Sequence, residues 1–171
     1  MGDAEVLFTA YRDRVFRYLV RIVGSGHAGE LTQDVFLRVA RGPVPHGDEG
    51  GRRAWVFSIA RNLALNHVRD ARRHGTVVEL VDRPAPATQE LAVAIDEALA
   101  RLETTDRDVF LLRESAGLSY DEVARASGLT IDAVRSRLHR TRLQLRQSLR
   151  ATLDSNGNEH GVRLYERPRK Q

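Results

Sequence analysis

The chain of 171 residues contains no cysteine. This absence excludes disulfide scaffolds, cysteine-ligated zinc, iron–sulfur clusters and a cysteine nucleophile. No apolar run approaches the ~20 residues that a membrane span needs, and the N-terminus lacks the basic start and apolar stretch of a secretory signal. We therefore expect a soluble cytoplasmic protein that does not insert into a membrane.

Lysine is almost as scarce as cysteine, because Lys170 is the only lysine among 27 basic residues. Such arginine usage can reflect a GC-rich genome, but arginine also suits phosphates and base edges better than lysine does. The hydrophobic share of 42% is enough for a packed core. The length allows one medium domain or two small ones.

The net charge of +4 conceals an uneven distribution of charged residues. Residues 1–75 carry 12 basic and 8 acidic side chains, whereas residues 76–130 carry 5 and 11. Residues 131–153 carry 6 basic side chains and 1 acidic one, and the last 18 residues carry 4 and 3. Segments of different charge indicate different partners, and the two basic segments are candidates for contact with nucleic acid.

Apolar residues recur at helical spacing in three segments of the first half of the chain, 4–23, 28–41 and 52–73. Between the last two segments, residues 42–51 contain four glycines and two prolines, which is typical of a loop. No segment alternates convincingly between apolar and polar residues with a period of two. We therefore expect an all-α fold.

Residues 74–89 break the helical spacing, and Pro84 and Pro86 indicate a linker. Helical spacing resumes at Leu91, and a cluster of Asp, Ser, Asn and Gly beyond residue 153 indicates a polar tail. The expected organisation is two small helical domains on a linker. These parts are residues 1–74, a linker over 75–90, a second domain over 91–153 with a helix-turn-helix, and a tail over 154–171.

The segment from Ser119 to Arg150 predicts this helix-turn-helix. Ser119 and Glu122 have the spacing of a capping box, in which each residue satisfies a backbone N–H of the other. Gly128 suits the left-handed residue that ends a short helix, and Thr130 can cap the next helix. The segment therefore predicts a short helix, a tight turn and a long second helix.

Small and β-branched residues at the crossing point support the same motif, because Ala124 and Val134 lie where two helices must approach closely. The second helix carries six arginines between residues 135 and 150, and no acid follows Asp132 before Asp154. One alternative is a surface helix with a solvated arginine-rich face, but the caps, the turn and the one-sided charge together favour DNA binding. The residues expected near bases and phosphates in a major groove are Arg135, Ser136, His139 and Arg140.

Taken as ordered motifs, residues 6–150 resemble the extracytoplasmic-function (ECF) sigma factors, a group of small bacterial RNA polymerase sigma subunits. Residues Tyr11–Leu19 look like the start of sigma region 2, Glu30–Val39 like its polymerase-docking helix, and Arg53–Ala64 like its −10 recognition helix. The segments Asp106–Glu114, Gly117–Ala124 and Val134–Arg140 look like region 4. Ordered motifs of this kind are far more specific than a lone helix-turn-helix.

The resemblance implies a function and its partners. A sigma factor binds core RNA polymerase at the clamp helices of the largest subunit and at the flap, directs it to the −10 and −35 elements of promoter DNA, and helps to open the −10 strand by holding a flipped base. An anti-sigma factor is the expected regulator. The implied polymerase contacts are Gln33, Asp34 and Arg38. The implied −35 contacts are Arg135, Ser136, His139 and Arg140, and the implied −10 contacts are Trp55, Arg61, Asn62, His67, Arg69, Arg72 and Arg73, of which Trp55 has a second interpretation as a core residue.

Two other classes of function remain open at this point. An enzyme fits poorly, because the chain has no HExxH, Walker or Gly-x-Ser-x-Gly motif and its six histidines are scattered, so we expect no catalytic residue, cofactor or metal. An ordinary transcriptional regulator would use the same helix-turn-helix but has no reason to carry both the docking helix and the basic helix of residues 28–73. The acidic segment 76–130 either lines a polymerase surface or folds back on the basic helices of the free protein.

Overall fold

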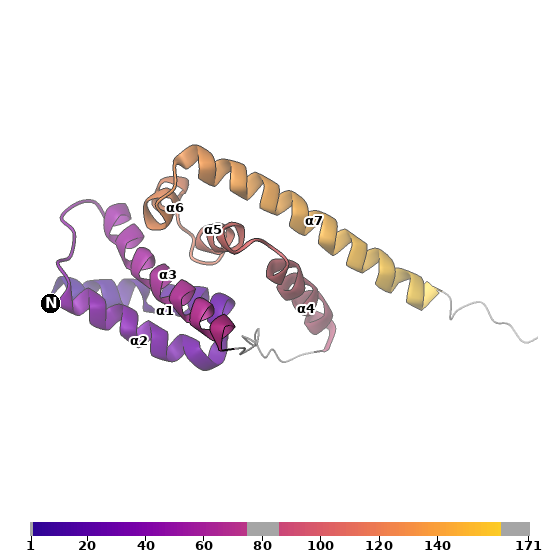
Figure 1. Ribbon diagram of the computed structural model, residues 1–171, viewed down its shortest axis with the longest axis horizontal. Coiled ribbons are helices and arrows are strands. Elements are labelled where there is room, and N and C mark those ends of the chain that lie inside the picture. The colour runs from indigo at the N-terminus through magenta and orange to yellow at the C-terminus, as the bar shows by residue number, and fades with distance from the viewer. Residues whose placement is uncertain (1, 75–85, 162–171) are drawn as a thin grey trace, which may run out of the picture.

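The structure, a computed structural model, describes the backbone of residues 2–74 and 86–161 and the side chains of residues 2–74 and 92–151. Every regular element in these ranges is a helix, which confirms the all-α fold. The helices are α1 (Asp3–Val23), α2 (Ser25–Arg41), α3 (Glu49–Arg73), α4 (Pro86–Ala100), α5 (Thr104–Glu114), α6 (Tyr120–Ser127) and α7 (Ile131–Gly161). Figure 1 shows α1–α3 as a first body and α4–α7 as a second body, with α7 extending far beyond both.

The first body begins with a tight reversal between α1 and α2. Gly24 has a φ of 80°, a conformation that costs glycine little, and it ends α1 and precedes α2 without any intervening loop. The second helix therefore starts at Ser25, earlier than the predicted residue 28. The aromatic rings of Tyr18 and Phe57 meet edge to face between α1 and α3, with centroids 5.8 Å apart, and both side chains are fully buried.

The third helix also starts earlier than predicted, at Glu49 rather than 52. Asp48 caps it, because its Oδ1 accepts a hydrogen bond of 2.8 Å from the backbone N–H of Gly51. The two glycines at positions 50 and 51, which the composition assigned to a loop, therefore lie in the first turn of α3. The loop before it is correspondingly shorter.

The second body contains the predicted helix-turn-helix, formed by α6 and α7. Ser119 and Glu122 make both hydrogen bonds of the capping box, and Gly128 ends α6 with a left-handed φ of 69°. The hydroxyl of Thr130 accepts a hydrogen bond from the N–H of Ala133 at 3.2 Å, as expected of a cap. This local prediction is confirmed in detail.

Two boundaries differ from the sequence-based expectation. Helix α4 begins at Pro86, inside the predicted linker, because proline is tolerated in a first helical turn, where its missing N–H is not needed. Helix α7 continues through the predicted breaker cluster to Gly161, since an existing helix extends at much lower cost than a new one nucleates. The rest of the predicted linker, 75–85, and the end of the tail, 162–171, lie outside the described residues.

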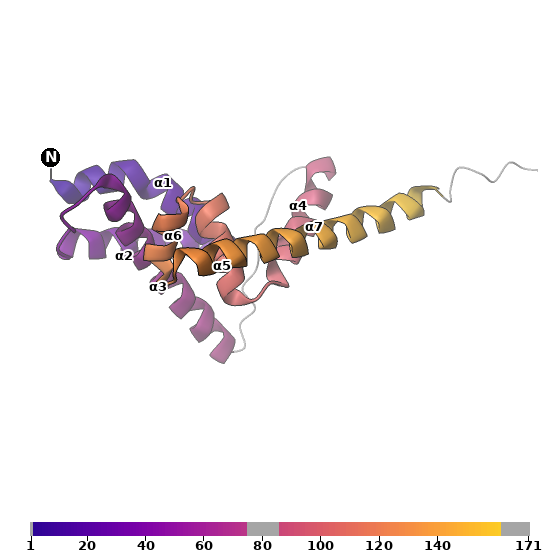
Figure 2. The same cartoon turned by 90° about the horizontal axis from the view of Figure 1, so that it is seen from above.

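The two bodies share one hydrophobic core. Buried side chains of α1–α3 and of α5–α7 form a single cluster, and α3 packs along α6 while α1 packs on α5. The view from above in Figure 2 shows α5 and α6 against the first body, with the far end of α7 leading away from it. The DNA-directed modules that the sequence predicts are therefore in direct contact here.

We expect Phe57→Ala to lower the free energy of unfolding by about 3–5 kcal/mol, because it leaves a cavity beside Tyr18 in the shared core. Urea denaturation followed by far-UV circular dichroism measures the change. The matched control is Leu143→Ala, since Leu143 is a large apolar side chain exposed on α7, and its effect should stay within about 0.5 kcal/mol. Equal losses in the two variants would contradict the assignment of Phe57 to the core.

Candidate nucleic-acid and polymerase interfaces

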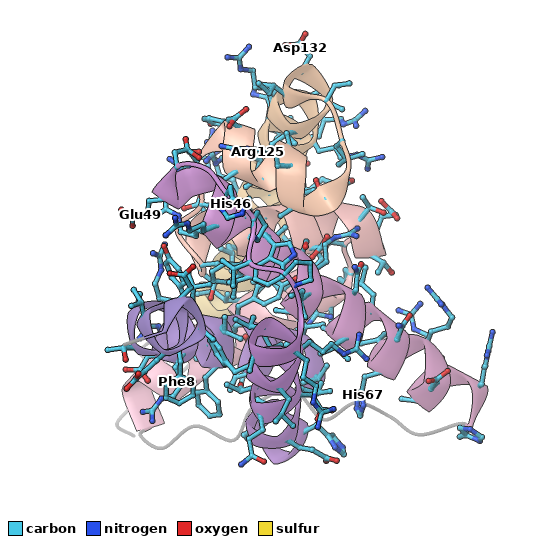
Figure 3. The ribbon with its side chains drawn as sticks, turned by 90° about the vertical axis from the view of Figure 1, so that its left-hand side faces the viewer. Phe8, His46, Glu49, His67, Arg125 and Asp132 are labelled. Carbon is cyan, nitrogen blue, oxygen red and sulfur yellow. The ribbon has the colours of Figure 1, made fainter. Side chains whose placement is uncertain are left out.

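The first candidate surface is the N-terminal half of α7. Its buried stripe consists of Val134, Leu138 and Thr141, and these residues fix the rotation of the helix. The four residues expected to face the −35 element are consequently all exposed, namely Arg135, Ser136, His139 and Arg140. Figure 3 shows Asp132, in the first turn of α7, at a tip of the molecule, so this end of the helix is open to a large partner.

Two other arginines of α7 have a structural role instead. Arg137 pairs with Asp106 at 2.6 Å, and Arg142 pairs with Glu114 at 2.7 Å. The hydrogen bond that Arg137 donates to Asp106 raises the pKa of Arg137, and the one that Arg142 donates to Glu114 raises the pKa of Arg142. Both side chains bind α7 to α5. The arginines of this helix therefore fall into two groups, with Arg137 and Arg142 paired to α5 and Arg135 and Arg140 exposed to solvent.

The second candidate surface is α3, and here the predicted residues do not form one face. Asn62, Arg69, Arg72 and Arg73 are exposed, whereas Trp55, Arg61 and His67 are partly covered. Trp55 packs against the core, as its second interpretation had it. The ring of His67 lies 4.5 Å from that of His27, and burial, together with that neighbouring histidine, lowers the pKa of His67.

Arg61 is engaged by the second body. Its Nε lies 2.5 Å from Oδ2 of Asp108 on α5, and the hydroxyl of Tyr18 donates to the other carboxylate oxygen at 2.7 Å. Asp108 is only 2% exposed. Burial raises its pKa, although Arg61 and Tyr18 both act in the opposite direction. One carboxylate thus joins α1, α3 and α5.

A second ion pair joins the start of α3 to α6. Arg53 lies 2.5 Å from Oε1 of Glu122, the same carboxylate that closes the capping box. Burial acts to raise the pKa of Glu122, but the hydrogen bonds from Ser119 and Arg53 lower it overall. A Cβ at Gly50 would stand 2.9 Å from this carboxylate, so a larger residue at position 50 would force the Glu122 side chain to shift.

Further contacts lie in the same interface between the two bodies, which we call the seam. The guanidinium of Arg14 donates to the carbonyl oxygen of Ala116, and Arg21 pairs with Asp96 at 2.6 Å. Arg125 of α6 lies 3.8 Å from Asp48, the residue that caps α3. Of the two roles left open for the acidic segment, the structure shows, for its described residues 86–130, the one in which it packs on the basic helices.

The third candidate surface runs along α1 and α2. Of the predicted polymerase contacts on α2, Gln33 and Arg38 are exposed and Asp34 is partly covered. Beside them is a groove of about 500 Å³, lined by Phe8, Arg12, Asp13, Phe16, Gly29, Thr32 and Gln33. Phe8 is 41% exposed and Phe16 is 40% exposed. We call this feature the aromatic groove.

Sequence reasoning missed two functional candidates. The apolar residues that recur at helical spacing in 4–23 are Phe8, Tyr11, Val15, Tyr18 and Ile22, and this spacing predicts that Phe8 faces the core. Instead Leu7 is buried and Phe8 lies at the surface, edge to face with Phe36, with ring centroids 5.0 Å apart. It also passed over Arg53, whose ion pair with Glu122 joins residues far apart in the sequence. Among the described residues, no three histidine, aspartate or glutamate side chains come together as metal ligands.

Comparison with known proteins identifies the family. A family model for sigma-70 region 2 matches residues 7–74, and one for sigma-70 region 4 matches residues 92–145. The ECF RNA polymerase sigma factor SigC of Mycobacterium tuberculosis is 32% identical over 147 residues, an alignment that covers 81% of this chain and 78% of SigC. The chain belongs to the ECF RNA polymerase sigma factors. It therefore acts in transcription initiation with RNA polymerase, as the resemblance implied.

Other sigma factors are similar along most of this chain. SigE of Mycolicibacterium smegmatis is 35% identical over 164 residues, covering 87% of this chain and 62% of SigE. Among solved structures, the sigma factor RpoE of Bartonella quintana, in complex with the anti-sigma factor NepR, superposes with a TM-score of 0.70 at 21% identity, covering 88% of this chain and 98% of that one. CnrH, in complex with the cytosolic domain of CnrY, superposes with a TM-score of 0.64 at 23% identity, covering 86% of this chain and 88% of that one. These two likenesses show a shared fold. None of the described helices has the length and hydropathy to cross a membrane.

We expect Arg61→Met to lower the free energy of unfolding by about 3 kcal/mol at pH 7, because it leaves the buried Asp108 carboxylate without its cation. Asp108→Asn in the same chain should restore most of this loss, since no buried charge then remains. Urea denaturation of the unmodified protein, the two single variants and the double variant forms a double-mutant cycle, which measures the coupling free energy between Arg61 and Asp108. The matched control is Arg135→Met, which breaks an exposed pair with Asp132 and should cost no more than about 0.5 kcal/mol.

The pH dependence of this cycle has a definite sign. The pKa of Asp108 is raised in the folded protein, and removing Arg61 raises it further, so the folded state takes up a proton more readily than the unfolded state as the pH falls. The loss caused by Arg61→Met should therefore shrink on acidification. A loss that is independent of pH, or that adds simply to the loss from Asp108→Asn, would contradict the pairing.

Proposed function

We propose that this sigma factor reads the −35 element with α7 and the −10 element with α3. The observation that carries this proposal is the division of charge on α7, where Arg137 and Arg142 are held by α5 while Arg135 and Arg140 are exposed. Exposed arginines at the N-terminal half of a recognition helix suit guanine edges and phosphates in a major groove. Ser136 and His139 add hydrogen-bonding groups on the same face.

The role proposed for α3 is contact with the opened −10 strand and its phosphates. Asn62, Arg69, Arg72 and Arg73 are exposed and ready for it, with His67 beside them. Arg61 is held by Asp108, so it becomes available only when the second body moves away. Trp55 supports the loop before α3, because its ring lies next to Gly42.

The part of α3 that carries Arg53 and Arg61 cannot face DNA while these arginines pair with α6 and α5, so the closed free chain is proposed to bind promoter DNA more weakly than the open one. Core polymerase is proposed to bind the two bodies at separate sites and so hold them apart at the spacing of the two promoter elements. Tethered modules held at the right spacing gain effective concentration without any new contact. Polymerase would thus supply both the opening of the seam and the geometry of recognition.

Polymerase itself is proposed to dock on α2 through Gln33, Asp34 and Arg38, by way of the clamp helices of its largest subunit, with its flap meeting the second body. An anti-sigma factor is the proposed regulator, in keeping with the complexes in which two proteins of this fold were solved. The protein is proposed to act in the cytoplasm, where polymerase and promoter DNA are found, as a binding subunit without catalytic chemistry of its own.

Transcription in vitro with core polymerase, over a library of −35 and −10 variants, tests the proposed function. We expect the sigma factor to direct initiation only from templates that carry one preferred sequence at each element. Duplex binding by the free protein without any complex with core polymerase would show that it acts instead as an ordinary DNA-binding regulator.

We expect Arg140→Ala to weaken use of the preferred −35 element by about 1–3 kcal/mol and to relax preference at one base pair, as loss of a bidentate base contact does. Transcription titrated with the variant holoenzyme over the −35 library measures both effects. The matched control is Arg146→Ala, an exposed arginine further along the same helix, which should leave sequence preference unchanged. An equal loss on every −35 sequence would assign Arg140 to a phosphate.

We expect Arg38→Glu to weaken binding of core polymerase at least about tenfold, equivalent to about 1.4 kcal/mol, because it reverses a charge on the exposed face of α2. Fluorescence titration of labelled protein with core polymerase measures the affinity. The matched control, Arg41→Glu, makes the same change at the end of the helix, beyond the aromatic groove. Identical affinities for the two variants would exclude this face of α2 as the docking site.

A further inference from the structure

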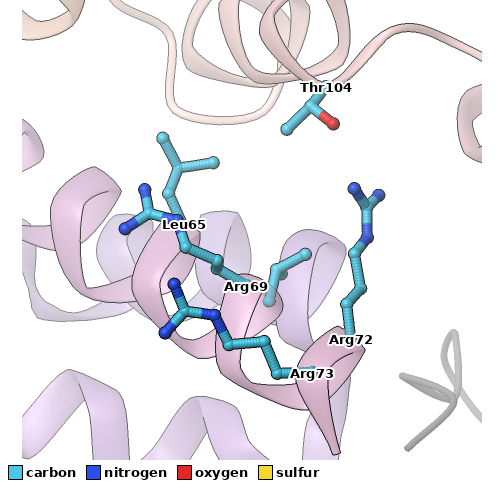
Figure 4. Close-up of a pocket in the computed structure, with 6 residues that line it drawn as sticks. Leu65, Arg69, Arg72, Arg73 and Thr104 are labelled. Atoms are coloured by element: carbon cyan, nitrogen blue, oxygen red, sulfur yellow. The ribbon is translucent and has the colours of Figure 1, made fainter. Parts of the chain in front are cut away.

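A second pocket lies on the seam, away from the aromatic groove. It has a volume of about 400 Å³ and is lined by Leu65, Val68, Arg69, Arg72 and Arg73 of α3 and by Thr104 of α5. Figure 4 shows the Arg72 side chain extending toward Thr104, with the guanidinium groups of Arg69 and Arg73 close together on the other side. We call it the seam pocket.

The inner end of the seam pocket reaches the interface between the two bodies. A smaller cavity of about 40 Å³ shares Leu65, Val68, Arg72 and Thr104 with it and adds Arg107 among its lining residues. The Nε of Arg107 is buried and has no hydrogen-bond partner among the described residues, although its Nη2 donates to the carbonyl oxygen of Arg21 at 2.5 Å. A buried guanidinium N–H without an acceptor is uncommon and unfavourable.

Positive charge in the seam pocket is not matched by the acids around it. Arg73 has a loose, exposed contact of 3.8 Å with Asp70, and Arg69 donates to the neutral amide of Asn66 at 3.3 Å. The nearby carboxylates are already engaged, since Asp108 binds Arg61 and Asp96 binds Arg21. Burial lowers the pKa of Arg107. The charge of Asp96 acts to raise this pKa, and repulsion from Arg72 acts to lower it further.

We propose that the seam pocket binds the polyphosphate group of a nucleotide, such as a nucleoside triphosphate. Arg69, Arg72 and Arg73 would hold the phosphates, for which the planar guanidinium fork is well suited. The apolar floor of Leu65 and Val68 would carry the base or sugar, and the volume is that of a small-ligand site. This inference rests on the proposed function, because it assigns a regulatory ligand to arginines that the proposal also gives to DNA phosphates.

Binding of this ligand would stabilise the packed arrangement of the two bodies. Its site contains residues of α3 and of α5, so it is complete only while the two bodies are packed together. A ligand that binds one arrangement better than another shifts the equilibrium toward it, and it must weaken DNA binding by the same factor by which DNA weakens ligand binding. Nucleotide binding would therefore hold the sigma factor closed and compete with the −10 strand.

Isothermal titration of the full-length free protein with ATP, and separately with tripolyphosphate at matched ionic strength, tests the inference. We expect ATP to bind more tightly than tripolyphosphate, because only ATP uses the apolar floor. Arg72→Ala should weaken ATP binding at least tenfold, whereas Arg17→Ala, which removes an exposed arginine from α1, should change it less than twofold. No saturable ATP binding, or equal losses in the two variants, would overturn the proposal.

A competition experiment separates the two sources of phosphate. ATP should displace a labelled single-stranded −10 oligonucleotide from the free protein, and Arg72→Ala should weaken both ligands. If binding of the oligonucleotide depends on Arg72 but ATP does not displace it, the pocket is a DNA contact only. That outcome would overturn the nucleotide site. Formation of a promoter complex by core polymerase and the sigma factor, measured in the absence of any nucleotide, distinguishes the two proposals, because correct promoter recognition there upholds the proposed function even if ATP does not bind the free protein.

Discussion

The buried carboxylate of Asp108 is the interaction on which the arrangement of this molecule depends. It accepts a hydrogen bond from Tyr18 of α1 and pairs with Arg61 of α3, although it belongs to α5. A charge taken out of water is tolerated only when it is paired and hydrogen-bonded, so these three helices must meet in this register. Because Asp106 of α5 also pairs with Arg137 of α7, the position of α7 depends on the same packing of α5 against the first body.

The closed seam leaves the two helices proposed to contact DNA in different states. The proposed −35 face of α7 lies open at a tip of the molecule, while the first half of α3 packs against α6, and two of its arginines pair with carboxylates of α5 and α6. Carboxylates occupy these two guanidinium groups, so Arg53 and Arg61 are not available to phosphates in this arrangement. Opening the seam would expose both arginines and would require the free energy of a binding partner.

The sequence predicted local features well because their causes are local. The capping box of Ser119 and Glu122, the left-handed Gly128 and the exposed face of α7 each depend on residues a few positions apart. The packing of the two bodies was only one of two open alternatives, since neither Arg53 nor Asp108 shows in the sequence which partner it meets. Helical spacing also misplaced Phe8, because a residue at the edge of an apolar stripe can face either the core or a groove.

Core polymerase is proposed to separate two bodies that are packed together in the free chain. The absence of native cysteine allows two dyes to be placed without ambiguity at Ser25→Cys on α2 and Gln147→Cys on α7, both exposed positions. Energy transfer between them, measured before and after addition of core polymerase, reports the separation. We expect high transfer in the free protein and a marked fall in the complex. Unchanged transfer in a complex that initiates transcription would contradict it.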